Sequence, residues 1–264
     1  RSQARGGIGS KASASRDQDF IEYVHQASMH STMMFFTEMG RLYWLKVYEI
    51  PEGNKQSKGR AIQNIINLQK GDKVRAFINV KGLNDAEYVQ NHYLIFATKN
   101  GLMKKTTLEA YSRPRANGII ALSLREGDEL IGVRLTDGES EMLIASYNGK
   151  VVRFPENTIR PMGRSASGVR AIKLDEDSQD RAVGMICVEK GSDKTVLVIS
   201  DKGFGKRTAL DDENGEPIYR ITNRGGKGVK TMNLTDKTGP LIGIDAVTDA
   251  DDLMLITKSG TAIR

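Results

Sequence analysis

The chain has 264 residues, with 39 Lys and Arg against 33 Asp and Glu, a net charge of +6, and 39% hydrophobic residues. This composition excludes a disordered chain. The apolar runs of the sequence are far shorter than the roughly 20 residues of a membrane-spanning helix, so the sequence predicts no such helix. The single cysteine, Cys187, excludes an intrachain disulfide and a multi-thiolate metal site. We expect a cytoplasmic, core-forming protein whose basic charge favours a polyanionic partner.

Five segments repeat one pattern along the chain. Each has an apolar run, a turn that ends in Gly and a second β-rich run, and the turn glycines are Gly40, Gly101, Gly149, Gly203 and Gly260. Their spacing averages about 55 residues. Because Gly accepts the positive φ angle of tight turns, each segment predicts a β-hairpin.

A second element alternates with the hairpins. It has a basic residue, then a Gly, then an apolar run, and its glycines are Gly9, Gly59, Gly118, Gly168 and Gly228. The two elements together predict an all-β chain of four-stranded blades. Radial repetition buries both faces of such small sheets, so we expect one propeller-like domain over residues 1–264, with incomplete repeats at both ends. The single Trp44, without a Trp-Asp dipeptide, excludes WD-type repeats.

Basic residues recur at fixed positions of this repeat. The fourth position after the hairpin Gly holds Trp44, Lys105, Arg153, Arg207 and Arg264, and Lys104 and Lys206 come one residue earlier in their repeats. The fourth position before the second Gly holds Arg5, Lys55, Arg164 and Arg224, with Arg115 shifted by one. Equivalent positions of radial blades lie on a common ring, which predicts a basic rim that follows a phosphate backbone. The alternative is a set of solvated strand faces whose charges protect sheet edges.

Two Gly-rich segments add to the predicted rim. Residues 3–9 contribute Gln3, Arg5, Gly6, Gly7 and Gly9, with Lys11 close behind, and residues 223–228 contribute Arg224 and Lys227. Glycines expose backbone N–H groups to a phosphate, and Arg adds a bidentate donor.

At this point the sequence resembles a known family, the C-terminal domain of the gyrase A protein of DNA gyrase. Residues 3–9 are similar to its seven-residue signature box, although Ala4 and Ile8 stand where the family usually has basic residues. Residues 223–228 resemble a partial second copy, with Lys227 at the position of Ile8. Residues 127–133, 149–154 and 203–208 are further matches, so the resemblance covers essentially the whole chain.

The resemblance implies a six-bladed β-pinwheel whose blades exchange strands, of which five hairpins are countable here. It implies that the outer rim binds, bends and wraps duplex DNA without sequence specificity, and so enables negative supercoiling. It also implies partners, namely double-stranded DNA, the rest of gyrase A, and gyrase B, in a complex with two copies of each. Catalytic residues, metal ligands and the use of ATP and magnesium are expected in other domains, with no cofactor in this one.

Two alternatives remain open from the sequence. One is the corresponding C-terminal domain of topoisomerase IV, which usually lacks the signature box. The other is a protein-interaction propeller that uses its flat face or channel and has little salt-dependent affinity for DNA.

Overall fold

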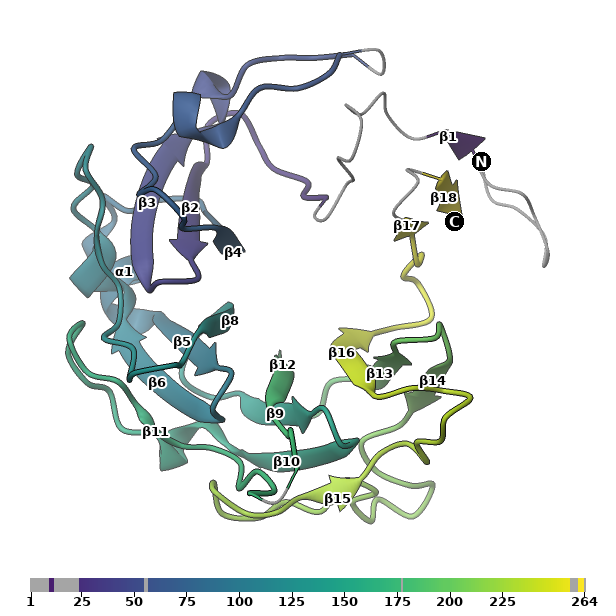
Figure 1. Ribbon diagram of the computed structural model, residues 1–264. Helices are drawn as coiled ribbons and strands as arrows, with labels where there is room; N and C mark the ends of the chain where they lie inside the picture. The colour runs from purple at the N-terminus through teal and green to yellow at the C-terminus, as the bar shows by residue number, and fades with distance from the viewer. Residues whose placement is uncertain (1–9, 12–23, 55–56, 177, 257–260, 264) are drawn as a thin grey trace.

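The computed structural model describes residues 10–11, 24–54, 57–176, 178–256 and 261–263. Five antiparallel sheets follow one another around a ring, and the strands β4, β8, β12 and β16 lie on its inner side (Figure 1). This arrangement confirms the predicted all-β fold of radially repeated blades.

The blades take their numbers from the order of their hairpins. Blade 1 has the strand order β4 (Val74–Val80), β2 (Thr32–Thr37), β3 (Arg41–Lys46), β7 (Ile119–Ile120). Blade 2 has the order β8 (Leu130–Thr136), β5 (Tyr93–Thr98), β6 (Leu102–Thr107), β11 (Val169–Arg170). Blade 3 has the order β12 (Ala182–Val188), β9 (Glu141–Ser146), β10 (Lys150–Pro155), β15 (Val229–Lys230).

The other two blades have three strands each within the described residues. Blade 4 has the order β16 (Leu241–Val247), β13 (Thr195–Ser200), β14 (Gly205–Thr208). Blade 5 has the order β17 (Leu255–Ile256), β18 (Thr261–Ile263), β1 (Ser10–Lys11). The helical elements are short: α1 (Ala86–Asn91) and the 3-10 turns Val47–Glu49, Ile62–Asn64, Leu108–Tyr111 and Glu156–Thr158.

The predicted hairpin turns are confirmed where the structure describes them. Gly40, Gly101, Gly149 and Gly203 have φ angles of 84°, 79°, 81° and 81°, in the left-handed region that favours glycine. Gly260 lies outside the described residues, but β17 and β18 on either side of it form the expected antiparallel pair.

The blades exchange strands. The outer strands β7, β11 and β15 are formed by the Gly-led elements at Gly118, Gly168 and Gly228, and each pairs with the hairpin of the preceding repeat. The element after Gly59 was predicted as a strand, which is wrong, because Ile62–Asn64 forms a 3-10 turn. Its partner would be a hairpin that precedes blade 1, and the described residues hold none there.

The first and last strands meet in one sheet. Strand β1 pairs antiparallel with β18, with Ser10 opposite Ala262 and Lys11 opposite Thr261. Figure 1 accordingly shows β1 beside β18. The Gly-led element at Gly9 thus gives blade 5 its outer strand, as the equivalent elements do for blades 1 to 3.

Both faces of a blade are buried. Along β5, Leu94 and Phe96 pack in the core between blades 1 and 2, whereas Ile95 and Ala97 pack in the core between blades 2 and 3. Such a strand reads as a continuous apolar run rather than an alternating one. A side chain in the middle of a hairpin strand therefore lies between blades, which decides where the basic residues of the repeat go.

Candidate nucleic-acid interface

Lys104 on β6 points into the interface with blade 1. Its side chain is fully buried, and its Nζ donates to the carbonyl oxygens of Ala121 and Arg164 at 2.6 Å each, with Gly163 O at 3.4 Å. The ammonium also lies 5.0 Å from the centroid of the Phe96 ring. Burial, with a smaller effect from the Arg164 charge, lowers the pKa of Lys104 to about 7. Lys104 thus connects two blades and has no contact with solvent.

Lys105, the next residue, points to the other side. Its Nζ lies 2.9 Å from Oε1 of Glu156, whose side chain is fully buried at the edge of blade 3. The same carboxylate accepts hydrogen bonds from Thr136 Oγ1 at 2.7 Å and from the N–H of Ser140 at 3.1 Å. This buried ion pair joins blades 2 and 3.

Arg153 on β10 has the same role between blades 3 and 4. Its guanidinium bonds the carboxylates of Glu141 at 2.5 Å and Asp211 at 2.8 Å, and it donates to the carbonyl oxygens of Leu210 and Tyr219. Burial lowers its pKa, but the hydrogen bonds to the two carboxylates outweigh that effect and raise it overall. Trp44, at the equivalent position of blade 1, donates from Nε1 to Tyr111 O in blade 2 at 3.1 Å.

The prediction that Lys104, Lys105 and Arg153 form part of an exposed rim is therefore wrong. Their recurrence reflects a repeated bond between neighbouring blades, because both faces of a blade are covered. Lys206 and Arg207 are equivalent to Lys104 and Lys105 but remain exposed. Lys206 Nζ donates to Thr231 O at 3.1 Å, and Arg207 forms an ion pair with Asp249 at 2.6 Å.

The second basic series lies in a different place. Arg115, Arg164 and Arg224 are exposed and belong to the loops that lead into the outer strands β7, β11 and β15. The glycines that end these loops pass directly over the neighbouring strand. A Cβ on Gly118, Gly168 or Gly228 would lie only 2.7, 2.5 or 2.5 Å from a backbone carbonyl oxygen. The glycine therefore fixes each loop at the outer edge of a blade.

Two of these arginines are held by backbone groups. Arg164 donates to Ile120 O at 3.4 Å, and Arg224 donates to Thr158 O at 3.3 Å and Arg170 O at 3.2 Å. A guanidinium has five N–H donors, so most of them remain directed to solvent. We use the term rim loops for the loops that carry Arg115, Arg164 and Arg224.

The remaining predicted site residues are not placed by the structure. Gln3, Arg5, Gly6, Gly7, Gly9, Lys55 and Arg264 lie outside the described residues. For Lys11 the structure gives only the backbone, in β1. The signature box at residues 3–9 stays a prediction.

A comparison with protein families decides the identity of the fold. The profile of the family described as "DNA gyrase C-terminal domain, beta-propeller" matches residues 31–81, 92–137, 140–189 and 194–248. The chain belongs to this family. The four matched segments correspond to the hairpins and inner strands of blades 1 to 4.

Individual relatives agree with the family assignment. The chain is 42% identical to the gyrase A protein of Staphylococcus aureus (strain NCTC 8325) over 264 residues, which is 100% of this chain and 28% of that protein. The same identity and coverage hold for the gyrase A protein of strain COL. The chain therefore spans little more than a quarter of the curated relatives it matches.

Solved structures share the fold. The C-terminal domain of DNA topoisomerase IV matches with a TM-score of 0.73 at 24% identity, over 89% of this chain and 69% of that one. A DNA gyrase A C-terminal domain matches with a TM-score of 0.71 at 23% identity, over 90% and 72%. The two scores are so close that the fold does not separate gyrase from topoisomerase IV.

Within the described residues we find no metal site, no membrane-spanning helix and no activated thiol. No group of three or more His, Cys, Asp and Glu side chains in the described ranges is arranged to hold a metal ion. None of the helices in those ranges has the length and apolar character to cross a membrane. Cys187 is a free thiol in contact with Met142, and burial raises its pKa to about 12, so it is not an activated nucleophile.

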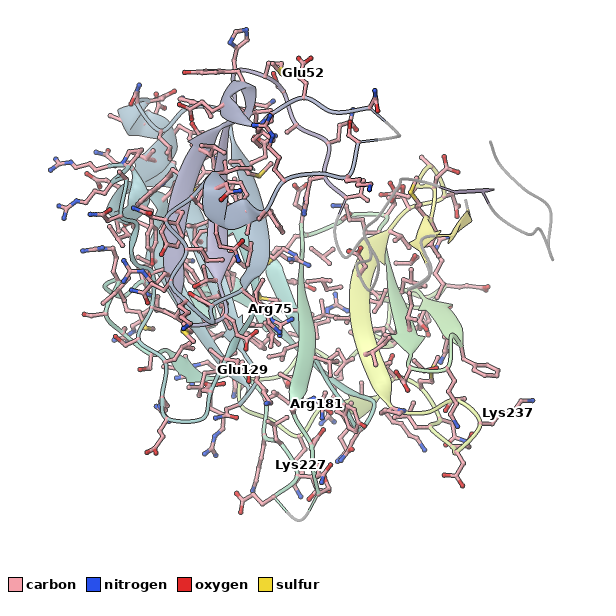
Figure 2. The ribbon with its side chains drawn as sticks, turned by 45° about the horizontal axis from the view of Figure 1, so that its top comes forward. Glu52, Arg75, Glu129, Arg181, Lys227 and Lys237 are labelled. Atoms are coloured by element: carbon pink, nitrogen blue, oxygen red, sulfur yellow. The ribbon has the colours of Figure 1, made fainter. Side chains whose placement is uncertain are left out.

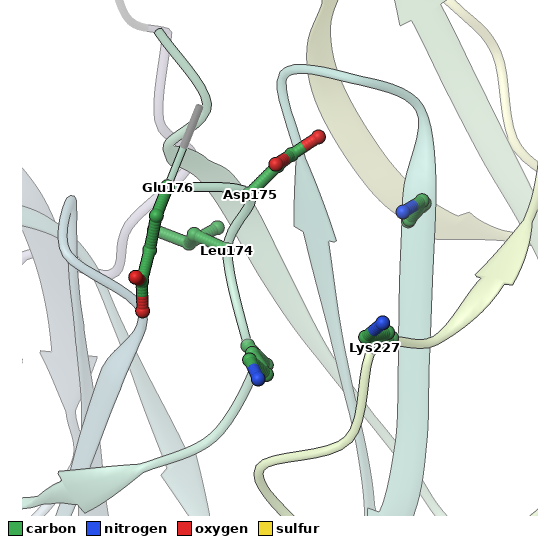
Figure 3. Close-up of a pocket in the computed structure, with 6 residues that line it drawn as sticks. Leu174, Asp175, Glu176 and Lys227 are labelled. Carbon is green, nitrogen blue, oxygen red and sulfur yellow. The ribbon is translucent and has the colours of Figure 1, made fainter. Parts of the chain in front are cut away.

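Sequence reasoning missed Lys150, Lys173 and Arg220, which lie beside the predicted residues Arg224 and Lys227. Lys150, Lys173 and Lys227 line one hollow beside β10 (Figure 3). Arg220 lines a second hollow together with Arg224 and Lys227. Lys150 directly follows the hairpin glycine Gly149, where the other repeats have Arg41, Leu102, Phe204 and Thr261. A comparison of this first position between repeats was the signal that could have found it.

Proposed function

We propose that this domain binds duplex DNA along its outer rim and bends it, without reading its sequence. The observation that carries the proposal is the rim-loop series, in which Arg115, Arg164 and Arg224 are exposed in the equivalent loop of three consecutive blades. Cations at equivalent radial positions present donors along a curve, which suits a phosphate backbone and provides no code for bases.

The cost of bending sets how many contacts are needed. A compact domain of 264 residues has a radius of gyration of about 18 Å. Its surface lies farther out, and the helix axis of DNA wound on that surface follows a circle with a radius of about 34 Å. Bending DNA through half a turn at that radius costs about 14 kcal/mol. Charge-assisted hydrogen bonds contribute about 1.5 to 3 kcal/mol each, so about five to nine contacts are required.

The corrected rim reaches the lower part of that range. The exposed candidates are Arg115, Arg164, Lys206, Arg207, Arg224 and Lys227. The number of phosphate contacts would be higher if the DNA path also includes Arg5, Lys11, Lys55 and Arg264. The bend therefore depends on many distributed contacts, and binding must weaken steeply as salt rises.

In the intact enzyme we propose that the bent segment is delivered for strand passage, so that gyrase introduces negative supercoils. This proposal rests on the identity to gyrase A proteins and includes the rest of gyrase A, and gyrase B, as partners. Catalysis, and the use of ATP and magnesium, would then belong to other domains, and this domain would need no cofactor. Topoisomerase IV is the alternative within the fold, and gyrase is favoured because the full-length relatives at 42% identity are gyrase A proteins.

The test is end-to-end energy transfer on a duplex of about 60 bp, which is about one circuit at the radius above. We expect compaction of the duplex at low salt that is lost as salt rises. Binding without compaction would instead support a domain like that of topoisomerase IV. An absence of binding at low salt would overturn the proposal and favour the protein-interaction propeller.

A further inference from the structure

Two hollows lined by cations lie on the outer side of blade 3. One hollow of about 260 Å³ is lined by Lys150, Lys173, Leu174, Asp175, Glu176 and Lys227 (Figure 3). A second hollow of about 460 Å³ lies under the loop before β15, and its charged lining consists of Arg220, Arg224 and Lys227. Lys227 lines both hollows, and we call the two hollows together the blade 3 groove.

The register of the outer strands adds to the positive charge. In blade 3, Lys150 of β10 lies directly opposite Lys230 of β15. The equivalent pairs hold one cation each, with Arg41 opposite Ile120 in blade 1 and Leu102 opposite Arg170 in blade 2. Like charges directly opposite each other disfavour strand pairing, and an anion beside them relieves that cost.

The cations of the groove are available to a ligand. Within the part of the chain that the structure describes, no ion pair engages Lys150, Lys173 or Lys227. The two hollows together are lined by five cations and two carboxylates, those of Asp175 and Glu176. In Figure 3, these two acidic residues lie on the segment across the hollow from Lys227.

The loop over the second hollow is held in place by its neighbours. The N–H of Gly225 donates to Ala171 O at 2.6 Å, and the N–H of Lys173 donates to Gly226 O at 2.8 Å. Gly225 and Gly228 have φ angles of 83° and 76°, which a residue with a side chain rarely adopts. A groove lined by side chains on a fixed glycine loop needs little ordering when an anion binds, so less affinity is lost.

We propose that the blade 3 groove is a phosphate anchor of the rim, where the DNA backbone is held more tightly than at the loops of Arg115 or Arg164. Arg224 and Lys227 hold the backbone from the loop, and Lys150, Lys173 and Arg220 extend the contact along β10 and toward blade 4. This assignment rests on the proposed DNA binding and adds residues to it. Among the described blades, DNA would therefore be held most tightly at blade 3.

The test compares two double substitutions that remove the same charge. The groove variant carries Lys150→Gln and Lys227→Gln. The control variant carries Lys190→Gln and Lys237→Gln, which remove two exposed lysines from other loops. Figure 2 shows Lys227 and Lys237 well apart, on different loops. Affinity for a duplex of about 60 bp is measured by fluorescence anisotropy, together with compaction by energy transfer. We expect at least a fivefold loss of affinity for the groove variant and less than a twofold loss for the control.

A third variant changes the shape of the groove without changing its charge. A Cβ on Gly226 would meet only Asn223 O at 3.7 Å and Thr222 Oγ1 at 3.9 Å, and its backbone conformation is open to other residues. Gly226→Ala should fold normally and weaken DNA binding by about twofold or more, since it obstructs close approach to the backbone.

The outcomes separate the anchor from the proposed function. If the unchanged domain compacts DNA but the groove variant loses no more affinity than the control, the anchor is wrong and the distributed rim stands. If the unchanged domain does not bind DNA, the proposed function itself fails. Titration with inorganic triphosphate is the last arm. Saturable binding of triphosphate in the absence of any DNA binding would assign the groove to a free polyphosphate and overturn the proposal.

Discussion

The two basic series of the repeat have opposite roles. In the strand-borne series, Lys104, Lys105 and Arg153 are buried and bond one blade to the next, while only the members in blade 4 stay exposed among the described residues. The loop-borne series, with Arg164 and Arg224, is exposed at the edges of the blades. The difference shows that recurrence of a cation in a radial repeat indicates a repeated environment, and that burial decides whether this environment is a partner blade or solvent.

The largest effect is expected from Arg153→Met. The substitution leaves the Glu141 carboxylate and the carbonyl oxygens of Leu210 and Tyr219 without their buried donor. Breaking a buried pair on one side costs about 3 to 5 kcal/mol of unfolding free energy. Urea unfolding measures this loss, and Arg164→Gln serves as the exposed control. An equal change for both variants would contradict the separation of the two series.

The next effect concerns the glycines that carry the rim loops. Gly168 has a φ angle of 96°, and a Cβ there would lie 2.5 Å from Met103 O. Gly168→Ala should cost about 1 to 3 kcal/mol from the strained backbone alone. Gly163→Ala in the same loop is the matched control, because its Cβ would meet nothing within 4 Å. Thermal unfolding of the pair checks this, and equal melting temperatures would show that the loop is not fixed in this way.

A smaller effect is expected from the titration of Lys104. Because burial lowers its pKa to about 7 from the usual 10.5, the unfolded state binds more protons than the folded state above pH 7. The free energy of unfolding should therefore rise as the pH increases from about 7 toward 10.5. Lys104→Met should remove this rise in urea unfolding measured between pH 6.5 and 8.5. The same slope in both proteins would mean that Lys104 keeps its proton in the folded state.

The smallest effect is expected from single rim substitutions. Arg115→Gln should leave unfolding unchanged within about 0.5 kcal/mol, as is usual for exposed positions. It should reduce the slope of log affinity against log salt by about 0.9, the value for one phosphate contact on duplex DNA. Filter binding across a salt series measures this slope for the variant and for the unchanged domain. An unchanged slope would remove Arg115 from the DNA path.

The sequence was sufficient to predict the repeat but not the surroundings of its charged side chains. Turn glycines such as Gly101 and runs such as Tyr93–Thr98 report local geometry, so the hairpins and the radial arrangement followed from them. The partner of Lys105 could not be predicted from the sequence, because Glu156 belongs to the next blade and looks like an ordinary turn residue. The short helix Ala86–Asn91 also lacked a long enough pattern to be predicted.

The same limit applies to the candidate site. The rim arginines were found because each precedes the glycine of its Gly-led element by three or four residues. The blade 3 groove was not predicted, because Lys150, Lys173 and Lys227 come from three separate segments that meet only in the folded ring. Charge at one repeat position is visible in a sequence, whereas the convergence of several positions on one surface needs the structure.

The central claim is that the exposed cations at the blade edges, above all the rim-loop arginines, hold and bend DNA, whereas the buried cations Lys104, Lys105 and Arg153 do not. It is tested most directly by energy transfer on the duplex of about 60 bp, with a triple variant carrying Arg115→Gln, Arg164→Gln and Arg224→Gln. We predict that this variant keeps the melting temperature of the unchanged domain but leaves the duplex extended at a salt concentration where the unchanged domain compacts it. Compaction equal to that of the unchanged domain would contradict the account.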